Sequence, residues 1–409
     1  MADRRSITRA PRLGLLALVV APAALLAAAP AAAAPGAAFF SGDVVVYRVG
    51  DGSAPLSSAA TPVFLDEFSP GGGLQSSTAL PTASAAANHR CTASGTATSE
   101  GQLTRSTDGR YLLAPCYDAA PGTASIAATT AASTPRVIGR VDNAKTIDTT
   151  TALTDAYSGN NIRSATSLDG IRLYAGGAGS TTDGGVRTAL LGNTASTQLE
   201  SVVTNVRTVT IAGGQLYLAT GSSTQKGVNT VGSPPPPSAP GQPTNQLPGA
   251  PEGGASDSAY AFRLVQLNPA STGPDTLYVA DDTAGQVRKF TLASGSWTQT
   301  GAVAAPGVRG LTAETAGTAT TIFATSGTTL FSVSDTTGYG GTVSGTAVSL
   351  ATAPTNEAFR GVALAPQPLV NPGTAIPEVP LAAALPLLGL GAFGAVATAR
   401  RRRLVRAAA

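Results

Sequence analysis

An arginine recurs at a spacing near fifty residues along the centre of this 409-residue chain, each time directly after an apolar residue. The arginines are Arg163, Arg207, Arg263, Arg309 and Arg360, and Gln102 takes the corresponding place in a sixth unit. A guanidinium group binds carboxylates and phosphates through paired N–H donors, so arginines brought to one level would form an anion site. The alternative is structural: each arginine pairs with an acidic or carbonyl group of the neighbouring unit, for example near Asp155.

The sequence lacks the residues that the common catalytic sites require. His89 is the only histidine, which excludes histidine-rich metal sites and relays of two histidines. A serine triad would need an activated turn of the G-x-S-x-G type, and the sequence contains none. We therefore assign no catalytic residue and expect a binding protein rather than an enzyme.

Acidic turns are the remaining candidates for a cation. Asp169-Gly170, Asp183-Gly184 and Asp281-Asp282 supply oxygen atoms, but none has the alternating carboxylates of a calcium loop. We expect hairpin turns and no cofactor. A divalent cation such as calcium is the alternative, because ligands can also be gathered from several units.

Cys91 and Cys116 are the only cysteines. An even number of cysteines favours a disulfide between them if the chain enters an oxidising compartment, and the N-terminal pattern described below predicts that it does. Two buried thiols are the alternative.

The elements that would position these residues are short β-strands separated by Gly, Asp, Asn and Pro turns, which predicts an all-β fold. One strand recurs as an aliphatic–aromatic pair followed by small or apolar residues. Its copies begin at Tyr111, Leu173, Leu216, Leu277 and Ile322, with a further copy at Val46. A unit of about fifty residues has room for four strands, and this period is typical of a β-propeller.

The two ends of the repeat region complement each other. The last apolar strand, around Phe359 to Leu364, has no strand after it, and the first, Val44 to Val49, lacks one before it. We expect the C-terminal strand to join three N-terminal strands, which closes the ring and protects two sheet edges. First strands near residues 103, 163, 207, 263, 309 and 360 predict six blades. Seven is the alternative if Ala119 to Asn161 forms a degenerate blade.

The segment from Asp275 to Asp282, continuing through Gly285, Val287 and Phe290, resembles the repeat of NHL- and lactonase-type propellers. The resemblance implies the fold, and propellers host enzymes and inert platforms alike. We assign the propeller to residues 39–366. Within it, residues 233–254 are rich in proline and are expected to form a stiff inserted loop.

The N-terminus has the pattern of an export signal. Positive residues at Arg4, Arg5, Arg9 and Arg12 precede an apolar stretch and an Ala-rich region, so residues 1–34 are assigned as a signal peptide with a signal helix. At the other end, residues 379–399 carry no charge and would span about 30 Å as a helix, the thickness of a bilayer core. We assign a transmembrane anchor there, after a linker at 367–378 and before a basic cytoplasmic tail at 400–409.

The C-terminal segment resembles the tripartite sorting signals of bacterial surface proteins, particularly the PEP-CTERM type. The resemblance rests on Pro377, Glu378, the apolar span and the cluster Arg400, Arg401, Arg402 and Arg403. Val379 interrupts the Pro-Glu-Pro motif. The resemblance implies a protein anchored at the outer face of a bacterial membrane or on the cell surface.

The formal net charge of +3 is a property of these two ends. Without their arginines the chain between them is acidic and has no basic stripe with interleaved aromatics, which argues against nucleic acid as a partner. We expect a binding platform for a protein or a small anion, with unknown oligomeric state. The alternatives are a metal-assisted lactonase-like hydrolase and a structural protein of the cell envelope.

Overall fold

The computed structural model describes residues 37–221, 225–249 and 258–368. Within these residues the chain forms strands β1 to β25 and one 3-10 helix, η1 (Ile126–Ala128), so the all-β prediction is confirmed. The signal peptide at 1–34, the anchor at 379–399, the basic tail and most of the linker lie outside the described residues. No helix in the described part of the chain is long and apolar enough to cross a membrane.

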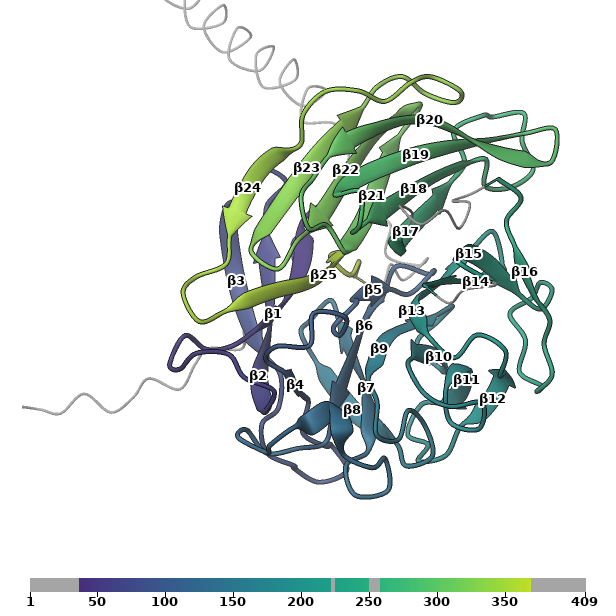
Figure 1. Cartoon of the computed structure of the whole chain (residues 1–409). Helices are drawn as coiled ribbons and strands as arrows, with labels where there is room; N and C mark the ends of the chain where they lie inside the picture. Colours follow the sequence, from purple (N-terminus) through teal and green to yellow (C-terminus); the bar gives the residue numbers. More distant parts are fainter. Residues whose placement is uncertain (1–36, 222–224, 250–257, 369–409) are drawn as a thin grey trace, which may run out of the picture. The chain divides into compact units, whose positions relative to one another are not determined.

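Four antiparallel sheets each consist of four strands that are consecutive in sequence (Figure 1). The first contains β9 (Ile162–Ser167), β10 (Arg172–Gly177), β11 (Gly185–Leu190) and β12 (Thr197–Glu200). The second contains β13 (Val206–Ala212), β14 (Gln215–Thr220), β15 (Gly227–Val231) and β16 (Thr244–Gln246). The third contains β17 (Ala259–Val265), β18 (Thr276–Asp281), β19 (Gln286–Ala293) and β20 (Ser296–Ala304). The fourth contains β21 (Gly310–Ala316), β22 (Ala319–Thr325), β23 (Thr329–Asp335) and β24 (Val348–Thr352).

The fifth sheet has nine strands and joins the two ends of the described chain. Its path is β25-β1-β2-β4-β6-β7-β8, with β3 paired to β2 and β5 paired to β6. The strands are β1 (Val44–Val49), β2 (Ala60–Phe68), β3 (Leu74–Ala79), β4 (Thr92–Ser94), β5 (Thr104–Arg105), β6 (Tyr111–Tyr117), β7 (Arg136–Asp142), β8 (Ile147–Leu153) and β25 (Ala358–Leu364).

The predicted closure is present. β25 pairs antiparallel with β1, from Val44 opposite Leu364 to Val49 opposite Ala358, and β1 pairs in turn with β2. All residues of β1 and β25 are buried. The strand from the C-terminal part of the chain therefore protects an edge that β1 would otherwise expose.

The predicted count of six or seven blades does not appear as six or seven separate sheets. There are four separate four-stranded sheets, because the short strand β4 hydrogen-bonds to both β2 and β6 and merges the remaining strands into one sheet. The stretch from Ala119 to Asn161 adds no sheet of its own; it supplies η1, β7 and β8, and the two strands extend β6.

The first strand of each sheet faces a common centre. Contacts run from β25 to β5, from β5 to β9, and onward through β13, β17 and β21 back to β25 (Figure 1). This arrangement is that of a propeller, in which the innermost strands line a central channel.

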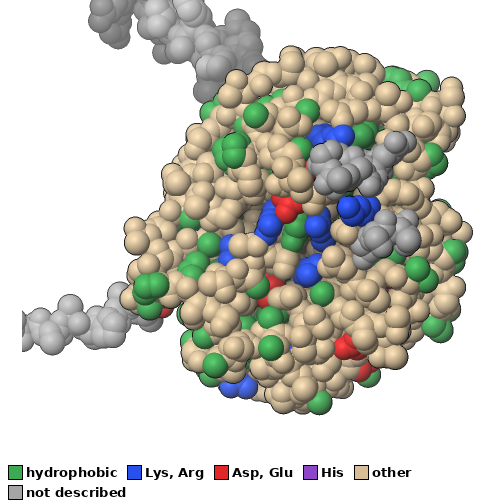
Figure 2. Space-filling model, viewed as in Figure 1, with side chains coloured by type: hydrophobic (Ala, Val, Ile, Leu, Met, Phe, Trp, Pro, Cys, Tyr) green, Lys and Arg blue, Asp and Glu red, His purple; other side chains and the backbone are tan. Residues whose placement is uncertain are grey.

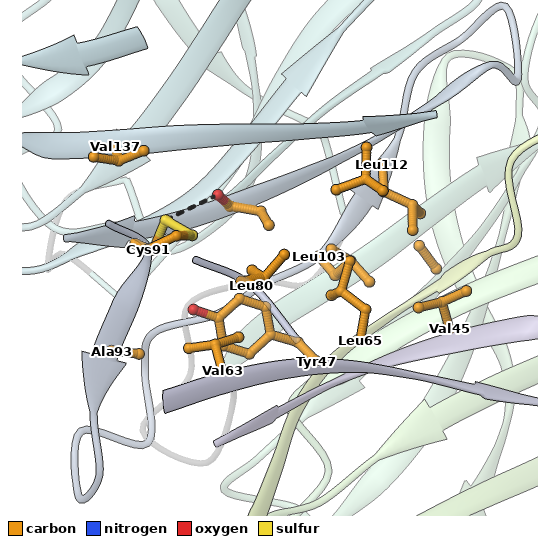
Figure 3. Packing of buried hydrophobic residues seen from close by; sticks show 14 of the residues in the cluster. Val45, Tyr47, Val63, Leu65, Leu80, Cys91, Ala93, Leu103, Leu112 and Val137 are labelled. Carbon is orange, nitrogen blue, oxygen red and sulfur yellow. Dashed lines mark hydrogen bonds between the residues drawn. A yellow bond between two sulfur atoms is a disulfide. The ribbon is translucent and has the colours of Figure 1, made fainter. Parts of the chain in front are cut away.

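The largest hydrophobic cluster lies within the nine-stranded sheet and contains Tyr47, Val63, Leu65 and Leu112 (Figure 3). The predicted disulfide between Cys91 and Cys116 is confirmed and is buried in the same cluster, with a Cα–Cα distance of 5.1 Å. It ties the segment before β4 to β6, next to the point where β4 joins the two parts of the sheet.

The described part of the proline-rich segment contacts the neighbouring sheet. The Tyr174 hydroxyl donates to the Pro236 carbonyl at 3.1 Å, and the Gln242 amide donates to the Leu199 carbonyl at 2.7 Å. β16, which follows, completes its own sheet by pairing with β15. The segment thus bridges the β9–β12 and β13–β16 sheets.

Candidate functional site

A β-bulge at the start of several inner strands places the recurring arginines. In β9 and β13, Arg163 and Arg207 have no residue directly opposite them on the neighbouring strand. In β25, Arg360 and Gly361 together face Tyr47. A bulge twists the strand locally and redirects a side chain. The bulges therefore interrupt the regular alternation of side chains between the two faces of each strand. They do so at the same end of the channel, which we call the mouth.

Arg207 and Arg309 meet at a shared aromatic ring and a shared carboxylate. Their guanidinium carbons lie 4.7 Å and 5.0 Å from the centroid of the Tyr260 ring. Arg309 contacts Asp282 through Nε and Nη2, both at 3.0 Å, while Arg207 Nη1 lies 3.7 Å from the other carboxylate oxygen. Cation–π contact and charge pairing together fix both guanidinium groups.

Arg163 and Arg360 are held by uncharged groups. Arg163 donates to the side chain of Asn205, which precedes β13 of the next sheet. Arg360 is 4% exposed and donates to the carbonyls of Phe359, at 3.0 Å, and Gly95, at 2.9 Å. Burial lowers the pKa of the Arg360 guanidinium.

These contacts show the structural pairing considered from the sequence: the arginines bond to acidic, amide or carbonyl groups of adjacent elements. The partner suggested near Asp155 is not used, because Asp155 pairs with Arg187 at 3.2 Å.

Arg263 does not join the others at the mouth. Tyr260 and Ala261 together face Ala280 in the bulge of β17, so Tyr260 occupies the level at which Arg163 and Arg207 lie. Arg263 comes further along the same strand and lines a second cavity deeper in the channel, together with Gln102. The expectation of one arginine per unit at one height is corrected here, since a tyrosine takes that place in β17.

The mouth contains a cavity of about 220 Å³ (Figure 2). Its walls are Thr98, Asp282, Gly307, Arg309, Ser326, Gly327, Phe359 and Arg360. Figure 2 shows Lys and Arg side chains gathered around the centre of this face, with few acidic groups among them. Two guanidinium groups, one carboxylate and two hydroxyls form a lining that favours an anionic ligand.

Glu100 is a second carboxylate near the mouth, and it is 1% exposed. It accepts hydrogen bonds from the Tyr117 hydroxyl at 2.7 Å, from the Ser94 amide at 2.9 Å, and from the Asn161 side chain. Burial raises the pKa of Glu100 despite these donors. It stabilises the loop between β4 and β5 and does not line the cavity.

The other sequence candidates lie elsewhere and have local roles. His89 contacts Asp118 at 2.8 Å, beside an Arg90–Asp118 pair at 2.7 Å. Among the acidic turns, Asp169, Asp183 and Asp281 each accept a backbone amide of their own turn, from Ile171 at 2.9 Å, Ser180 at 2.6 Å and Ala284 at 2.9 Å. Asp281 also pairs with Arg288. In the residues that the structure describes, no group of three or more His, Cys, Asp or Glu side chains is placed to hold a metal ion.

Sequence reasoning missed Tyr260, Asp282, Thr98 and Ser326 as residues of the mouth. The sequence predicts Asp282 only as a turn residue, although it directly follows the last residue of β18. Tyr260 precedes Arg263 by three residues, and only the bulge in β17 selects it for the mouth. Thr98 and Ser326 sit in loops, whose positions no periodicity specifies.

No protein-family model and no curated protein matches the chain. Among solved structures, a nidogen/laminin complex is similar over 79% of this chain and 98% of the matched chain, with a TM-score of 0.47 and 10% identity. A putative 6-phosphogluconolactonase from Bacteroides uniformis matches over 76% and 83%, with a TM-score of 0.41 and 12% identity. A gluconolactonase from Xanthomonas campestris matches over 80% and 90%, with a TM-score of 0.42 and 12% identity. At these identities the likeness concerns the fold alone.

Proposed function

We propose that this chain is an exported propeller that binds a small carboxylate or phosphate at the channel mouth. The observation that carries the proposal is the cavity of about 220 Å³ whose walls hold Arg309 and Arg360 against the single carboxylate of Asp282. Asp282 can compensate only one of these two positive charges, and an anionic ligand would balance the other.

The two arginines retain donors for such a ligand. A guanidinium group carries five N–H bonds. Arg309 uses Nε and Nη2 for Asp282 and Nη1 for Thr98, and Arg360 uses Nη1 and Nη2 for carbonyls while its Nε has no partner among the described residues. The Tyr260 ring and Asp282 hold Arg309 in place, which lowers the entropy lost on binding.

The size of the cavity suits a small molecule. It is several times the ~30 Å³ that one water occupies in the liquid, and its walls come from loops and strand ends of three sheets. The candidate ligands share an anionic group that guanidinium groups bind, either a carboxylate or a phosphate. Titration of the protein with each kind of anion distinguishes the two.

The test is calorimetric titration of the protein with citrate, succinate and inorganic phosphate at low ionic strength. We expect one of them to bind, and Arg309→Gln to weaken that binding at least about tenfold, the effect of losing one charged hydrogen bond. Arg110→Gln removes the same charge from an exposed turn, where Arg110 pairs with Asp108, and should bind as the wild type does. Equal binding by the wild type and Arg309→Gln, or no binding of any anion, would refute the proposal.

The hydrolase alternative makes a different prediction. It is kept because Asp282, which lines the mouth, belongs to the segment that resembles the lactonase-type repeat. Metal analysis of the purified protein separates the hypotheses: a stoichiometric divalent ion together with lactone hydrolysis would replace the binding proposal. Concentration-dependent self-association without anion binding would favour a structural role.

We infer the location from the sequence of the two ends. The signal pattern at 1–34 and the apolar stretch at 379–399 support an exported domain anchored at the membrane surface, with the channel mouth accessible to external solutes. Protease treatment of intact cells should cleave the domain, and protection from the protease would contradict this location.

We further infer that the nine-stranded sheet acts as two blades, β25-β1-β2-β3 and β5-β6-β7-β8, with β4 as the link. Each half has four strands, and each supplies one strand to the channel. This division gives six inner strands around the mouth.

A further inference from the structure

A second cavity of about 30 Å³ lies inside the channel, below the mouth. Residues from β5, β13, β17, β21 and β25 line it, together with Gln102 just before β5. Its polar lining consists of Gln102, Thr104, Arg105, Thr208, Thr210, Arg263 and Thr312. It is separate from the mouth, because the two cavities have no lining residue in common.

Three buried polar atoms of this lining have no hydrogen-bond partner among the described residues: Gln102 Nε2, Thr208 Oγ1 and Arg263 Nε. Gln102 is 1% exposed and Thr208 is 4% exposed. A buried donor without an acceptor costs about 1–3 kcal/mol. Three such groups around one small space indicate that the space holds an acceptor.

The lining is also cationic. Arg105 and Arg263 both contribute to it, and no Asp or Glu does. Arg105 donates to the Ala365 carbonyl at 3.0 Å, and no ion pair joins either arginine to a carboxylate of the described chain. Burial lowers the pKa of both guanidinium groups; Arg105 lowers that of Arg263 further, and Glu314 partly counteracts the effect on Arg105.

A water molecule would accept these hydrogen bonds but would leave two like charges facing each other at low dielectric. An anion would both accept these hydrogen bonds and compensate the positive charges of Arg105 and Arg263. The small volume of the cavity favours a monatomic ion over the larger carboxylates and phosphates proposed for the mouth. We propose that the channel interior binds a chloride ion, or another halide, between Arg263, Thr208 and Gln102.

Bromide in place of chloride provides a direct test, since bromide scatters anomalously. Crystals of the wild-type protein grown or soaked in sodium bromide should show one anomalous peak between Arg263 and Thr208. A cavity without an anomalous peak under these conditions would overturn the proposal, whatever the variants do.

Thermal unfolding supplies an independent measurement in solution. At constant ionic strength, replacing sodium gluconate by sodium chloride should raise the melting temperature of the wild type saturably, as expected for a ligand that binds only the folded state. Arg263→Gln and Thr208→Val should lose most of this rise. Arg110→Gln should keep it, and an equal melting temperature in both salts for the wild type would contradict the site.

The proposal does not depend on the function of the mouth. Arg309→Gln should bind carboxylate or phosphate poorly and yet respond to chloride as the wild type does. Loss of the chloride response in Arg309→Gln would show that the two cavities form one site and would overturn the assignment of a separate one.

Discussion

At the scale of single residues, the cationic side chains differ in what compensates their charge. Arg136 is fully buried and is held mainly by backbone carbonyls, at 2.6 Å from Thr129 and Thr134, with the Tyr117 ring 5.0 Å from its guanidinium carbon. Arg309 pairs with the carboxylate of Asp282, whereas Arg263 Nε has no hydrogen-bond acceptor among the described residues. Because protein acceptors use the hydrogen-bond donors of Arg136, we regard this arginine as structural. The channel arginines keep donors that the protein does not use, which makes them candidates for ligand binding.

Lys289 and Asp335 form a fully buried pair that allows a sharp stability prediction. Lys289 Nζ lies 2.7 Å from the carboxylate, which also accepts the Tyr278 hydroxyl at 2.6 Å. Lys289→Met leaves the Asp335 charge unpaired and should lower the free energy of unfolding by about 3–5 kcal/mol in urea titrations. Lys226→Met, on a partly exposed lysine, should change it by less than about 0.5 kcal/mol. Similar small losses in both variants would show that the pair contributes little.

The same pair predicts a dependence on pH. Burial raises the pKa of Asp335, but hydrogen bonds from Lys289, Thr337 and Tyr278 outweigh it, so the folded pKa lies below the ordinary value. The pair then stabilises the fold above the unfolded pKa, and this contribution is lost as the pH falls through the folded pKa. The difference in unfolding free energy between wild type and Lys289→Met should therefore shrink below about pH 4. A constant difference down to pH 2 would contradict the assignment.

At the scale of elements, glycines next to the arginines let the inner strands approach closely. A Cβ added at Gly361 would lie 2.2 Å from the backbone nitrogen of Leu103 and 2.6 Å from the carbonyl of Gly101. The Gly361 amide donates to that same carbonyl at 2.9 Å. This contact joins β25 to the segment that leads into β5, where the two parts of the nine-stranded sheet lie side by side at the channel.

Gly361→Ala should therefore destabilise the protein by about 1–3 kcal/mol, because backbone atoms and not a flexible side chain would have to move. Gly273→Ala is a matched control, since a Cβ there meets nothing within 4 Å. Chemical unfolding of both variants measures the difference. Equal free energies of unfolding for the two variants would mean that β25 can move away from the segment before β5 without loss of stability.

Much of the element level could be predicted from the sequence. Alternating apolar residues and Gly-containing turns located the inner strands, and the incomplete units at both ends predicted the pairing of β25 with β1. Bulges could not be predicted, because one extra residue changes no composition and little periodicity, yet it decides that Tyr260 rather than Arg263 reaches the mouth. The link through β4 was also missed, since a strand of three residues, Thr92–Ser94, carries almost no pattern.

For the candidate site, the arginines could be predicted and their partners could not. Arg309 and Arg360 were found by recurrence, which reports on repeated strands. Asp282, Thr98 and Ser326 lie in connections between strands, and only the assembled ring brings them together. The deeper cavity could not be predicted for the same reason: Gln102 comes from the segment before β5, Thr208 from β13 and Arg263 from β17.

At the scale of the whole molecule, both cavities depend on closure of the ring. Arg360 lines the mouth, Val362 and Ala363 line the inner cavity, and all three belong to β25. The same strand contacts β1, β5 and β21. One strand from the C-terminal part of the chain thus completes the sheet edge, the channel and both proposed anion sites.

A variant ending at Glu357, which lacks β25, tests this dependence. It exposes the edge of the apolar strand β1, and an unpaired apolar edge promotes association. We expect oligomers in size-exclusion chromatography with light scattering, a weakened near-ultraviolet circular dichroism spectrum and no response to chloride. A variant ending at Pro368 retains β25 and should not associate through the edge of β1.

A peptide of residues 358–368 should restore part of the native spectrum and the chloride response of the shorter variant by adding the missing strand. If the shorter variant instead kept the melting temperature and chloride response of the longer one, closure by β25 would not be what holds the channel together.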